Sequence, residues 1–341
     1  MVNEMNLKKF FLTAMLCCFG MAIPQAKANF KLISQRHHVV CGVNADYNHL
    51  ARKQEGIMIG FYADLCRAIA QAILQDADSF KIKSVKTPNI GKLLKTGMID
   101  VMFDSNDFSP MEEAKQNIVP IDVMYYDRIV FASRQKNVKA SSMKDYAGQK
   151  VCVQDNSFAW HYVNRYNSKY ALGFNFVKFP LLSAVKEAFY LNRCPLVVGD
   201  EVFIKSIVED LHSDEAEVLP EEIGVVATRS YGALDNNIFN MSLKGIFSAL
   251  KIAAEQDVTS ADVETFKSST SPMIQNILNV TPQLWLSLGL VPDWAEKYIK
   301  TYGNYTEILE RNLGERSSLK LDMSHNKPYL DGGMMLASPL L

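Results

Sequence analysis

Acidic side chains are the residues with the clearest potential for chemistry in this sequence of 341 residues. Five of them fall at the ends of predicted strands, in the loops that follow, or in the first turn of a predicted helix: Asp104, Asp107, Glu112, Asp155 and Asp200. If they surround one cleft, they repel a lone carboxylate and favour a cationic ligand. The alternative is that they are solvated loop residues. The sequence offers no paired nucleophile and base, no metal-ligand cluster and no phosphate-binding glycine loop, which makes catalysis the weaker interpretation.

The segment 100–113 organises the predicted cleft. An apolar run ends at Phe103, and a helix is predicted to begin after Ser109, a favourable N-cap residue. Pro110 suits the first helical position and Glu112 lies three residues after the cap, which is the pattern of a capping box. Strand ends that lead into helix N-termini are where open α/β sheets bind ligands, and the free amides there attract anions. Glu112 therefore has two interpretations, as a capping residue and as an acid in the cleft.

Alternating strands and helices predict an α/β fold with parallel sheets, in which a second unit weakly repeats the pattern of the first. The predicted strands are 39–43, 80–85, 99–103, 125–133, 150–154, 174–179, 195–200 and 224–228. Helices are predicted after residue 60, at 90–95, after Ser109, at 156–166 and 182–191, from 201, and at 240–255, 274–290 and 294–302. Residues 44–56 are predicted to form a loop, and the tail from 303 an ordered strap.

The N-terminal residues 1–28 have the features of a cleavable secretory signal. Lys8 and Lys9 precede an apolar stretch at 10–23, and residues 26–28 form an A-x-A cleavage site. Cleavage after Ala28 would deliver the protein to the periplasm; the alternative is a short membrane anchor. The remaining chain is long enough for two lobes, which we place at 29–127 with 231–341, and at 128–230 as an inserted lobe.

Four cysteines follow the predicted signal, which in an exported protein argues for disulfides. Three pairings are open, and we expect Cys41–Cys66 and Cys152–Cys194, one within each lobe; four buried thiols are the alternative. The formal net charge of −1 at pH 7 gives no basic bias towards nucleic acid.

Several segments resemble the polar and general L-amino-acid solute-binding proteins of ABC transporters, the bacterial extracellular solute-binding protein family 3. The segments that carry the resemblance are 40–43, 60–70, 96–101, 125–127, 151–154, 192–194, Asp200 and 303–314. The resemblance implies a two-lobed periplasmic-binding-protein fold of type II, with two parallel or mixed sheets, flanking helices and two crossover strands. It further implies a binding protein without cofactor or enzymatic activity, which delivers an amino acid or related amine to an ABC permease in the inner membrane.

The residues of the predicted cleft depart from the family pattern. Glu112 stands where the family has the arginine that clamps the ligand carboxylate, and Asp104 stands where the subgroup usually has a basic residue. Asp200 matches the family acid that takes the ligand ammonium, although it could also be a plain helix N-cap. The candidate ligand-binding residues are Asp200, Ser157, Asn156, Asp104, Asp107, Ser109, Glu112, Tyr47, His49 and Phe158.

Three of these candidates are aromatic and could form walls over a ligand, although each such residue alone is more often a packing residue: Tyr47, His49 and Phe158. We expect no metal at His49, because no second histidine stands at ligand spacing. The missing arginine leaves two alternatives to transport. One is a sensor or interaction protein with an altered cleft, and the other is a dehydratase-like enzyme that uses Glu112 as a general acid.

Overall fold

A mixed sheet of eight strands forms the centre of the protein, in the order β4-β1-β5-β10-β6-β9-β7-β8. The computed structural model describes residues 28–86, 89–104, 108–134, 142–211, 215–278 and 283–340. Residues 1–27 of the predicted signal segment 1–28 therefore lie outside the described residues, whereas Ala28 is the first residue of α1. In the described ranges no helix is long and apolar enough to cross a membrane.

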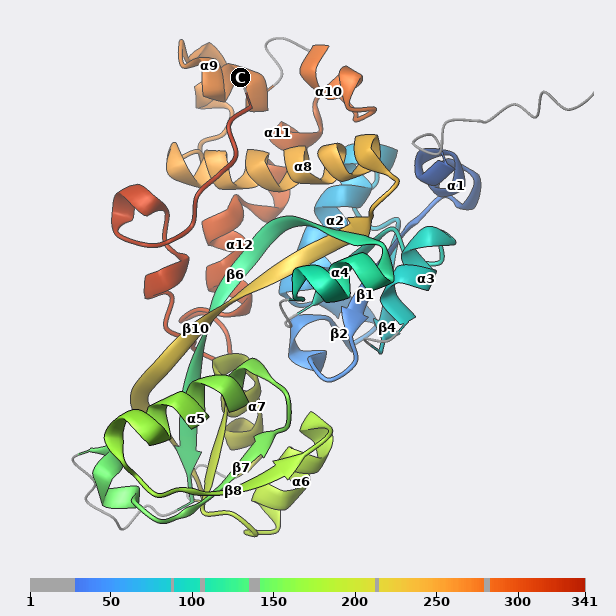
Figure 1. Cartoon of the computed structure of the whole chain (residues 1–341). Coiled ribbons are helices and arrows are strands. Elements are labelled where there is room, and N and C mark those ends of the chain that lie inside the picture. Colours follow the sequence, from blue (N-terminus) through green and yellow to red (C-terminus); the bar gives the residue numbers. More distant parts are fainter. Residues whose placement is uncertain are drawn as a thin grey trace, which may run out of the picture.

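The upper half of the molecule in Figure 1 is built on β4, β1 and β5. β1 pairs in parallel with both neighbours, which is why its residues are almost all buried. The helix α2 (Phe61–Leu74) packs on β1 and is buried along most of its length. The other elements of this half up to β5 are α1 (Ala28–Arg36), β1 (Val39–Asn44), η2 (Asn48–Leu50), β2 (Arg52–Gln54), β3 (Ile57–Ile59), β4 (Phe80–Val85), α3 (Ile90–Lys95) and β5 (Val101–Asp104).

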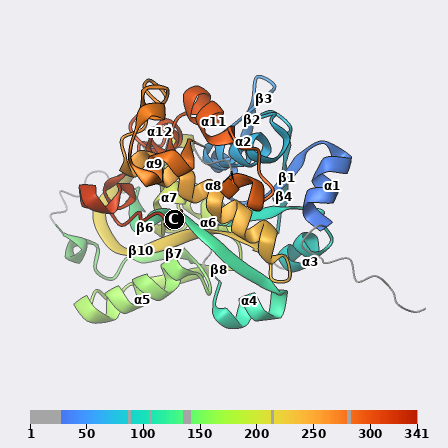
Figure 2. The ribbon, with the colours of Figure 1, turned by 90° about the horizontal axis from the view of Figure 1, so that it is seen from above.

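Helices from the C-terminal third complete the upper half. The longest, α8, packs against α2, α12 and β6, and Figure 2 shows it crossing the centre of the molecule seen from above. Buried Lys251 of α8 pairs with Asp122 of β6 at 2.8 Å. The remaining elements of this half are α4 (Pro110–Gln116), α8 (Asn237–Glu255), η5 (Thr265–Ser268), α9 (Pro272–Ile277), α10 (Gln283–Ser287), α11 (Trp294–Tyr302), α12 (Tyr305–Asn312), η6 (Ser324–Asn326) and η7 (Tyr329–Asp331).

The lower half repeats the arrangement on a smaller scale. The strand β7 pairs in parallel with β8 and β9, and helices flank the sheet. A separate apolar cluster, which includes Val151, Val163 and Val198, fills the space between this sheet and α5. The elements are η4 (Met143–Tyr146), β7 (Lys150–Gln154), α5 (Phe158–Tyr170), β8 (Asn175–Phe179), α6 (Leu182–Tyr190), β9 (Leu196–Asp200) and α7 (Glu201–Asp210).

Two long antiparallel strands run through both halves: β6 (Ile118–Ser133) and β10 (Glu217–Ala233). Their register extends from Ala233 opposite Ile118 to Glu217 opposite Ser133. In the upper half β10 pairs with β5, and in the lower half β6 pairs with β9 from Ile129 onward. The strand predictions at 125–133 and 224–228 were therefore correct in type but too short.

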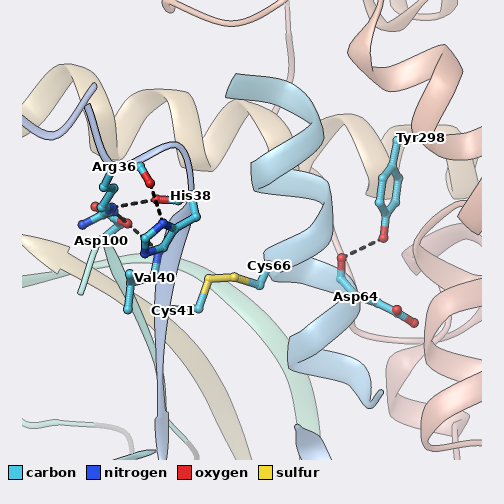
Figure 3. The surroundings of a disulfide bond; sticks show 8 residues. All are labelled: Arg36, His38, Val40, Cys41, Asp64, Cys66, Asp100 and Tyr298. Carbon is cyan, nitrogen blue, oxygen red and sulfur yellow. Dashed lines mark hydrogen bonds and ion pairs between the residues drawn. A yellow bond between two sulfur atoms is a disulfide. The ribbon is translucent and has the colours of Figure 1, made fainter. Parts of the chain in front are cut away.

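Both predicted disulfides are present, Cys41–Cys66 and Cys152–Cys194, with Cα–Cα distances of 6.2 Å and 5.7 Å. Figure 3 shows the first, which ties β1 to α2.

The same view shows Asp100, just before β5, paired with Arg36 at the end of α1. Asp64 lies on the far side of α2 in this view. Its carboxylate accepts hydrogen bonds from Arg311 (2.8 Å) and Asn312 (2.7 Å) of α12.

Two local predictions need correction. Residues 44–56, predicted as a loop, contain η2 and the short strand β2, which pairs with β3. The tail from 303 was predicted as a strap, but it begins with the regular helix α12, which Asn304 and Glu307 start with a capping box. The strap itself starts after this helix.

Candidate functional site

Asp200 lies at the junction of β9 and α7 and contacts both halves of the molecule. One carboxylate oxygen accepts the backbone N–H of Phe203 at 3.0 Å, which makes Asp200 the N-cap of α7. The other oxygen accepts the hydroxyl of Tyr47 at 2.7 Å. Tyr47 is buried and follows β1, so this hydrogen bond joins the upper half to the lower half.

A second carboxylate, that of Asp127, lies beside Asp200. Asp127 is buried on β6, and its carboxylate accepts the backbone N–H of Glu201 at 3.0 Å. Burial raises the pKa of Asp127 well above its usual range, and the negative charges of Asp200 and Glu201 raise it further. Burial likewise raises the pKa of Asp200. Backbone N–H groups in the first turn of α7 thus bind two carboxyl groups near Tyr47, the buried Asp127 and the half-buried Asp200.

These two acids border a cavity under the N-terminus of α5. Its other polar lining residues are Tyr47, Gln154 and Ser157. The apolar lining comprises Ile129, Phe158, Ala159, Leu182, Val198, Gly199 and Val226. Among the described residues that line it, none is a lysine, arginine or histidine. The lining therefore combines acidic groups with an apolar wall, but the cavity volume of about 20 Å³ in this arrangement has room for only about one water molecule. A ligand with an ammonium group and a small apolar part would fit these walls only after the halves move apart.

A wider gap opens beside this cavity, where the N-terminus of α4 faces that of α5. The α4 side is formed by Phe108, Ser109, Pro110 and Glu112, and the α5 side by Gln154, Asp155, Asn156, Ser157, Phe158 and His161. Ser157, Phe158 and Gln154 line both spaces. The structure thus brings Tyr47 and Asp200 together with the predicted candidates of the α5 loop, and places Ser109 and Glu112 opposite that loop.

The side chain of Glu112 is engaged in the capping box that the sequence predicts. Its carboxylate accepts the backbone N–H of Ser109 at 3.0 Å and the Ser109 hydroxyl at 2.8 Å, while the Glu112 N–H donates to the Ser109 hydroxyl. The backbone hydrogen bond from Ser109, followed by the one from its hydroxyl, lowers the pKa of Glu112. Glu112 therefore stands at the rim of the gap as an ionised side chain.

Two other predicted cleft acids have local partners. Asp155 forms an ion pair with Lys178 at 3.2 Å, and Lys178 also lies 3.8 Å from the ring centroid of Trp160. Asp104 is fully buried at the end of β5, where it accepts a hydrogen bond from Asn44 at 3.1 Å. It faces Arg229 of β10 in the strand register and lines neither of the two spaces described above. All four residues of β5 are buried, since this strand lies between β1 and β10 inside the sheet.

The remaining candidates lie elsewhere. His49 lines a separate pocket with Asp46, Ser183, Lys186 and Ser206, and burial followed by the charge of Arg52 lowers its pKa. It does not form a wall of the cavity at Asp200, because η2 turns it towards α6 and α7. Asp107 lies outside the described residues. Over the described ranges, no group of three or more His, Cys, Asp or Glu side chains could hold a metal ion.

Sequence reasoning missed Asp127 as a site residue. The available signal was an aspartate inside a long apolar strand, since a carboxylate at such a position is seldom buried without a partner. Gln154 and Leu182 were also missed, because their side chains carry no distinctive chemistry and only their position beside the α5 loop brings them to the cavity.

Comparison with known proteins gives consistent relatives, although no family model matches the chain. The general L-amino acid-binding periplasmic protein AapJ of Rhizobium johnstonii is 28% identical over 98% of this chain and all of its own length. The glutamate/glutamine/aspartate/asparagine-binding protein BztA of Rhodobacter capsulatus is 25% identical over 90% of this chain and 91% of its own.

Among solved structures, a periplasmic binding protein of an ABC transporter from Brucella ovis, with glutathione bound, superimposes with a TM-score of 0.82. It is 26% identical, and the match covers 92% of this chain and 99% of that one. The chain is thus a homologue of the amino-acid-binding periplasmic proteins of ABC transporters and has the periplasmic-binding-protein fold, as its sequence predicts.

Proposed function

We propose that this protein is the substrate-binding component of an ABC importer and that it binds an amino acid or related amine between two closing halves. The observation that carries the proposal is the position of Asp200: it borders a cavity and is hydrogen-bonded across the gap to Tyr47. The signal-like segment 1–28 supports export to the periplasm, with cleavage after Ala28. An inner-membrane ABC permease is the expected partner.

Closure would occur by bending of the two long strands. We assign residues 29–127 and 231–341 to one moving body and 128–230 to the other, so that β6 and β10 cross between them. Hinges of this kind need only a few residues to absorb the change in backbone angles. Opening would separate Tyr47 from Asp200 and admit the ligand.

The ligand ammonium would lie against Asp200. A cation at this place would favour the ionised form of Asp200, which burial otherwise makes costly, while the raised pKa of Asp127 favours its neutral form. Ser157 and the free amides at the start of α5 can meet a polar or negative group of the ligand. The apolar wall beside them, which includes Phe158 and Leu182, would cover its side chain.

The carboxylate of an amino-acid ligand has a weaker site here than in the family pattern. Glu112 replaces the clamping arginine and is ionised, so it disfavours a nearby carboxylate. This observation motivates the second candidate function, a sensor or interaction protein with an altered cleft. It also counts against Glu112 as a general acid, because a lowered pKa is the wrong direction for proton donation at neutral pH.

Thermal-shift screening of the purified protein tests the proposal. We expect stabilisation by at least one member of a panel of L-amino acids, polyamines and small peptides, including glutathione. Asp200→Asn should abolish the shift while it retains the helix cap, because asparagine caps helices as well as aspartate does. Asp235→Asn, on an exposed residue outside the cavity, is the matched control. No shift with any compound would overturn the transport proposal and favour the sensor.

A further inference from the structure

The chain that follows α12, residues 313–340, is a segment of turns with the two 3₁₀ helices η6 and η7, here named the C-terminal strap. It starts on the upper half, where the Leu313 N–H donates to the carbonyl of Leu309 in α12 at 2.7 Å. It returns to the upper half, where the Ala337 N–H donates to Glu255 at the end of α8 at 2.9 Å. Leu319 and other apolar side chains of the strap are buried, so the segment is packed in place. Figure 1 shows it in red, reaching down beside β10 before it turns back up.

The middle of the strap is fixed to β6 at the level where this strand passes between the halves. The side-chain amide of Asn326 donates to the carbonyl of Tyr126 at 2.8 Å and accepts the Tyr126 N–H at 2.7 Å. The strand β9 pairs with β6 only from Ile129 onward, so in the described ranges this edge of β6 has no neighbouring strand at Tyr126. Asn326 is buried and satisfies backbone groups that would otherwise lack a sheet partner.

Strap residues that precede Asn326 contact the hinge strands and the lower half. Asp322 pairs with Arg128 of β6 at 3.2 Å, and His325 lies 3.1 Å from Glu222 of β10. Earlier in the strap, the Ser318 hydroxyl donates to Glu209 of α7 at 3.3 Å, and Lys205 of the same helix donates to the Lys320 carbonyl.

The side chain of Arg128 links these strap contacts to the candidate site. Asp127 and Arg128 are neighbours on β6 and therefore point to opposite faces of the sheet. Asp127 accepts from the first turn of α7 beside Asp200, while Arg128 donates to Glu201 of the same helix at 2.9 Å and 2.8 Å and also pairs with Asp322. The strap is thereby linked to the helix whose N-cap is Asp200.

We propose that the C-terminal strap is a third connection between the halves and stabilises the arrangement in which Tyr47 reaches Asp200. Both ends of the strap are attached to the upper half, so its contacts with α7 and β10 must break or rearrange when the halves separate. Contacts that exist in one arrangement and not in the other shift the equilibrium towards the first. The inference rests on the proposed function in one respect, because it assumes that the halves bend about β6 and β10.

Distance measurements on the ligand-free protein test the strap without knowledge of the ligand. Spin labels are attached through Lys53→Cys on β2 and Lys150→Cys on β7, two exposed positions in different halves. The test variants are Asn326→Ala, and the milder double substitution Asp322→Asn with His325→Gln. The control is Asp293→Asn, which removes an ion pair within the upper half whose aspartate is 45% exposed, the same fraction as Asp322.

We expect both strap variants to increase the population with longer interlabel distances at least about threefold, since each lost exposed ion pair contributes only modestly. The control should match the wild type. If Asn326→Ala unfolds, the double variant decides the outcome, since it alters only partly exposed side chains. Distance distributions of folded strap variants that overlay the wild type would overturn the inference. Such a result would leave the proposed function untouched, because the thermal-shift screen of the wild-type protein tests ligand binding separately.

Discussion

Tyr47 and Asp200 are separated by 153 positions in the sequence, yet the tyrosine hydroxyl donates to the carboxylate at 2.7 Å. The two residues come from different halves, and both border the same cavity. Their hydrogen bond is therefore a direct marker of the distance between the halves. An ammonium ligand that approached Asp200 would meet a carboxylate already oriented by Tyr47 and by the Phe203 N–H.

Substitution of Tyr47 by phenylalanine tests this marker. The tyrosine hydrogen bond lowers the pKa of Asp200 against the larger effect of burial, which raises it. Tyr47→Phe should therefore raise the pKa of the Asp200 carboxyl further, because the charged form loses a donor. Carbon-detected NMR titration of the carboxyl measures the change. Tyr329→Phe, on a side chain that is 67% exposed, should leave the titration unchanged. An unaltered Asp200 titration in Tyr47→Phe would show that the bond does not persist in solution.

Asp100 should make stability depend on pH. Burial raises the pKa of Asp100 to about 6, against the opposing effects of Arg36 and the Val40 N–H. An unfolded aspartate has a pKa of about 3.9, so the folded state binds this proton more tightly. The stabilisation is fully present below about pH 4 and is lost as the pH rises through about 6, for a total of about 3 kcal/mol.

The measurement compares the wild type with Asp100→Asn, which cannot titrate at this position. We expect the free energy of unfolding of the wild type, relative to the variant, to fall by up to about 3 kcal/mol between about pH 4 and pH 7. Urea unfolding at several pH values supplies these free energies. Asp100→Asn also loses the ion pair with Arg36, which changes the free energy of unfolding by a constant amount. This constant cancels when the difference between wild type and variant is compared at two pH values. A difference that stays constant with pH would contradict the prediction.

Asp64 is expected to be the anchor of the C-terminal helices on α2. Its carboxylate accepts from Arg67, Arg311 and Asn312, and its backbone carbonyl accepts the Tyr298 hydroxyl at 2.7 Å (Figure 3). Asp64→Ala leaves buried Arg67 without this partner, and removal of one member of a buried pair costs about 3–5 kcal/mol. Urea unfolding should show a loss of this size, whereas Asp235→Ala on the surface should change stability by less than about 0.5 kcal/mol.

Glu112→Arg should change the ligand preference of the cleft. The substitution places a cation at the rim of the gap opposite the α5 loop, where it can pair with a ligand carboxylate. We expect Glu112→Arg to increase the affinity for free amino acids at least about tenfold more than the affinity for the corresponding amides. Calorimetry measures both affinities. Glu113→Arg makes the same change in charge one position along α4, on a residue outside the cleft lining. An equal effect of both substitutions would point to general electrostatics rather than a local contact.

The local structure of this chain follows closely from its sequence. The helix α3 has the predicted bounds, and the capping box of α4 forms as Ser109 and Glu112 indicate. These features depend on neighbouring residues, which is why sequence patterns capture them. The disulfide pairing also followed, since each bridge joins cysteines of the same half.

Features that depend on distant contacts were less predictable. The full lengths of β6 and β10 come from pairing across more than eighty residues of intervening chain, which local propensity does not encode. Asp104 was predicted for the cleft from its position after a strand, whereas its burial at the end of β5 and its hydrogen bond with Asn44 depend on contacts distant in the sequence. His49 lies within η2 and lines a different pocket from Tyr47, and no sequence signal supplied the direction of this short turn.

The disulfides have a consequence for how the protein works after export. The Cys41–Cys66 bridge stiffens the body that carries Tyr47, and Cys152–Cys194 stiffens the body that carries Asp200. Neither disulfide joins the two halves, so each constrains one half without fixing the angle between the halves that the proposed closure requires. The stability of each half and the proposed movement between the halves therefore depend on different bonds. Substitutions that change the stability of one half can leave the affinity for the ligand unchanged.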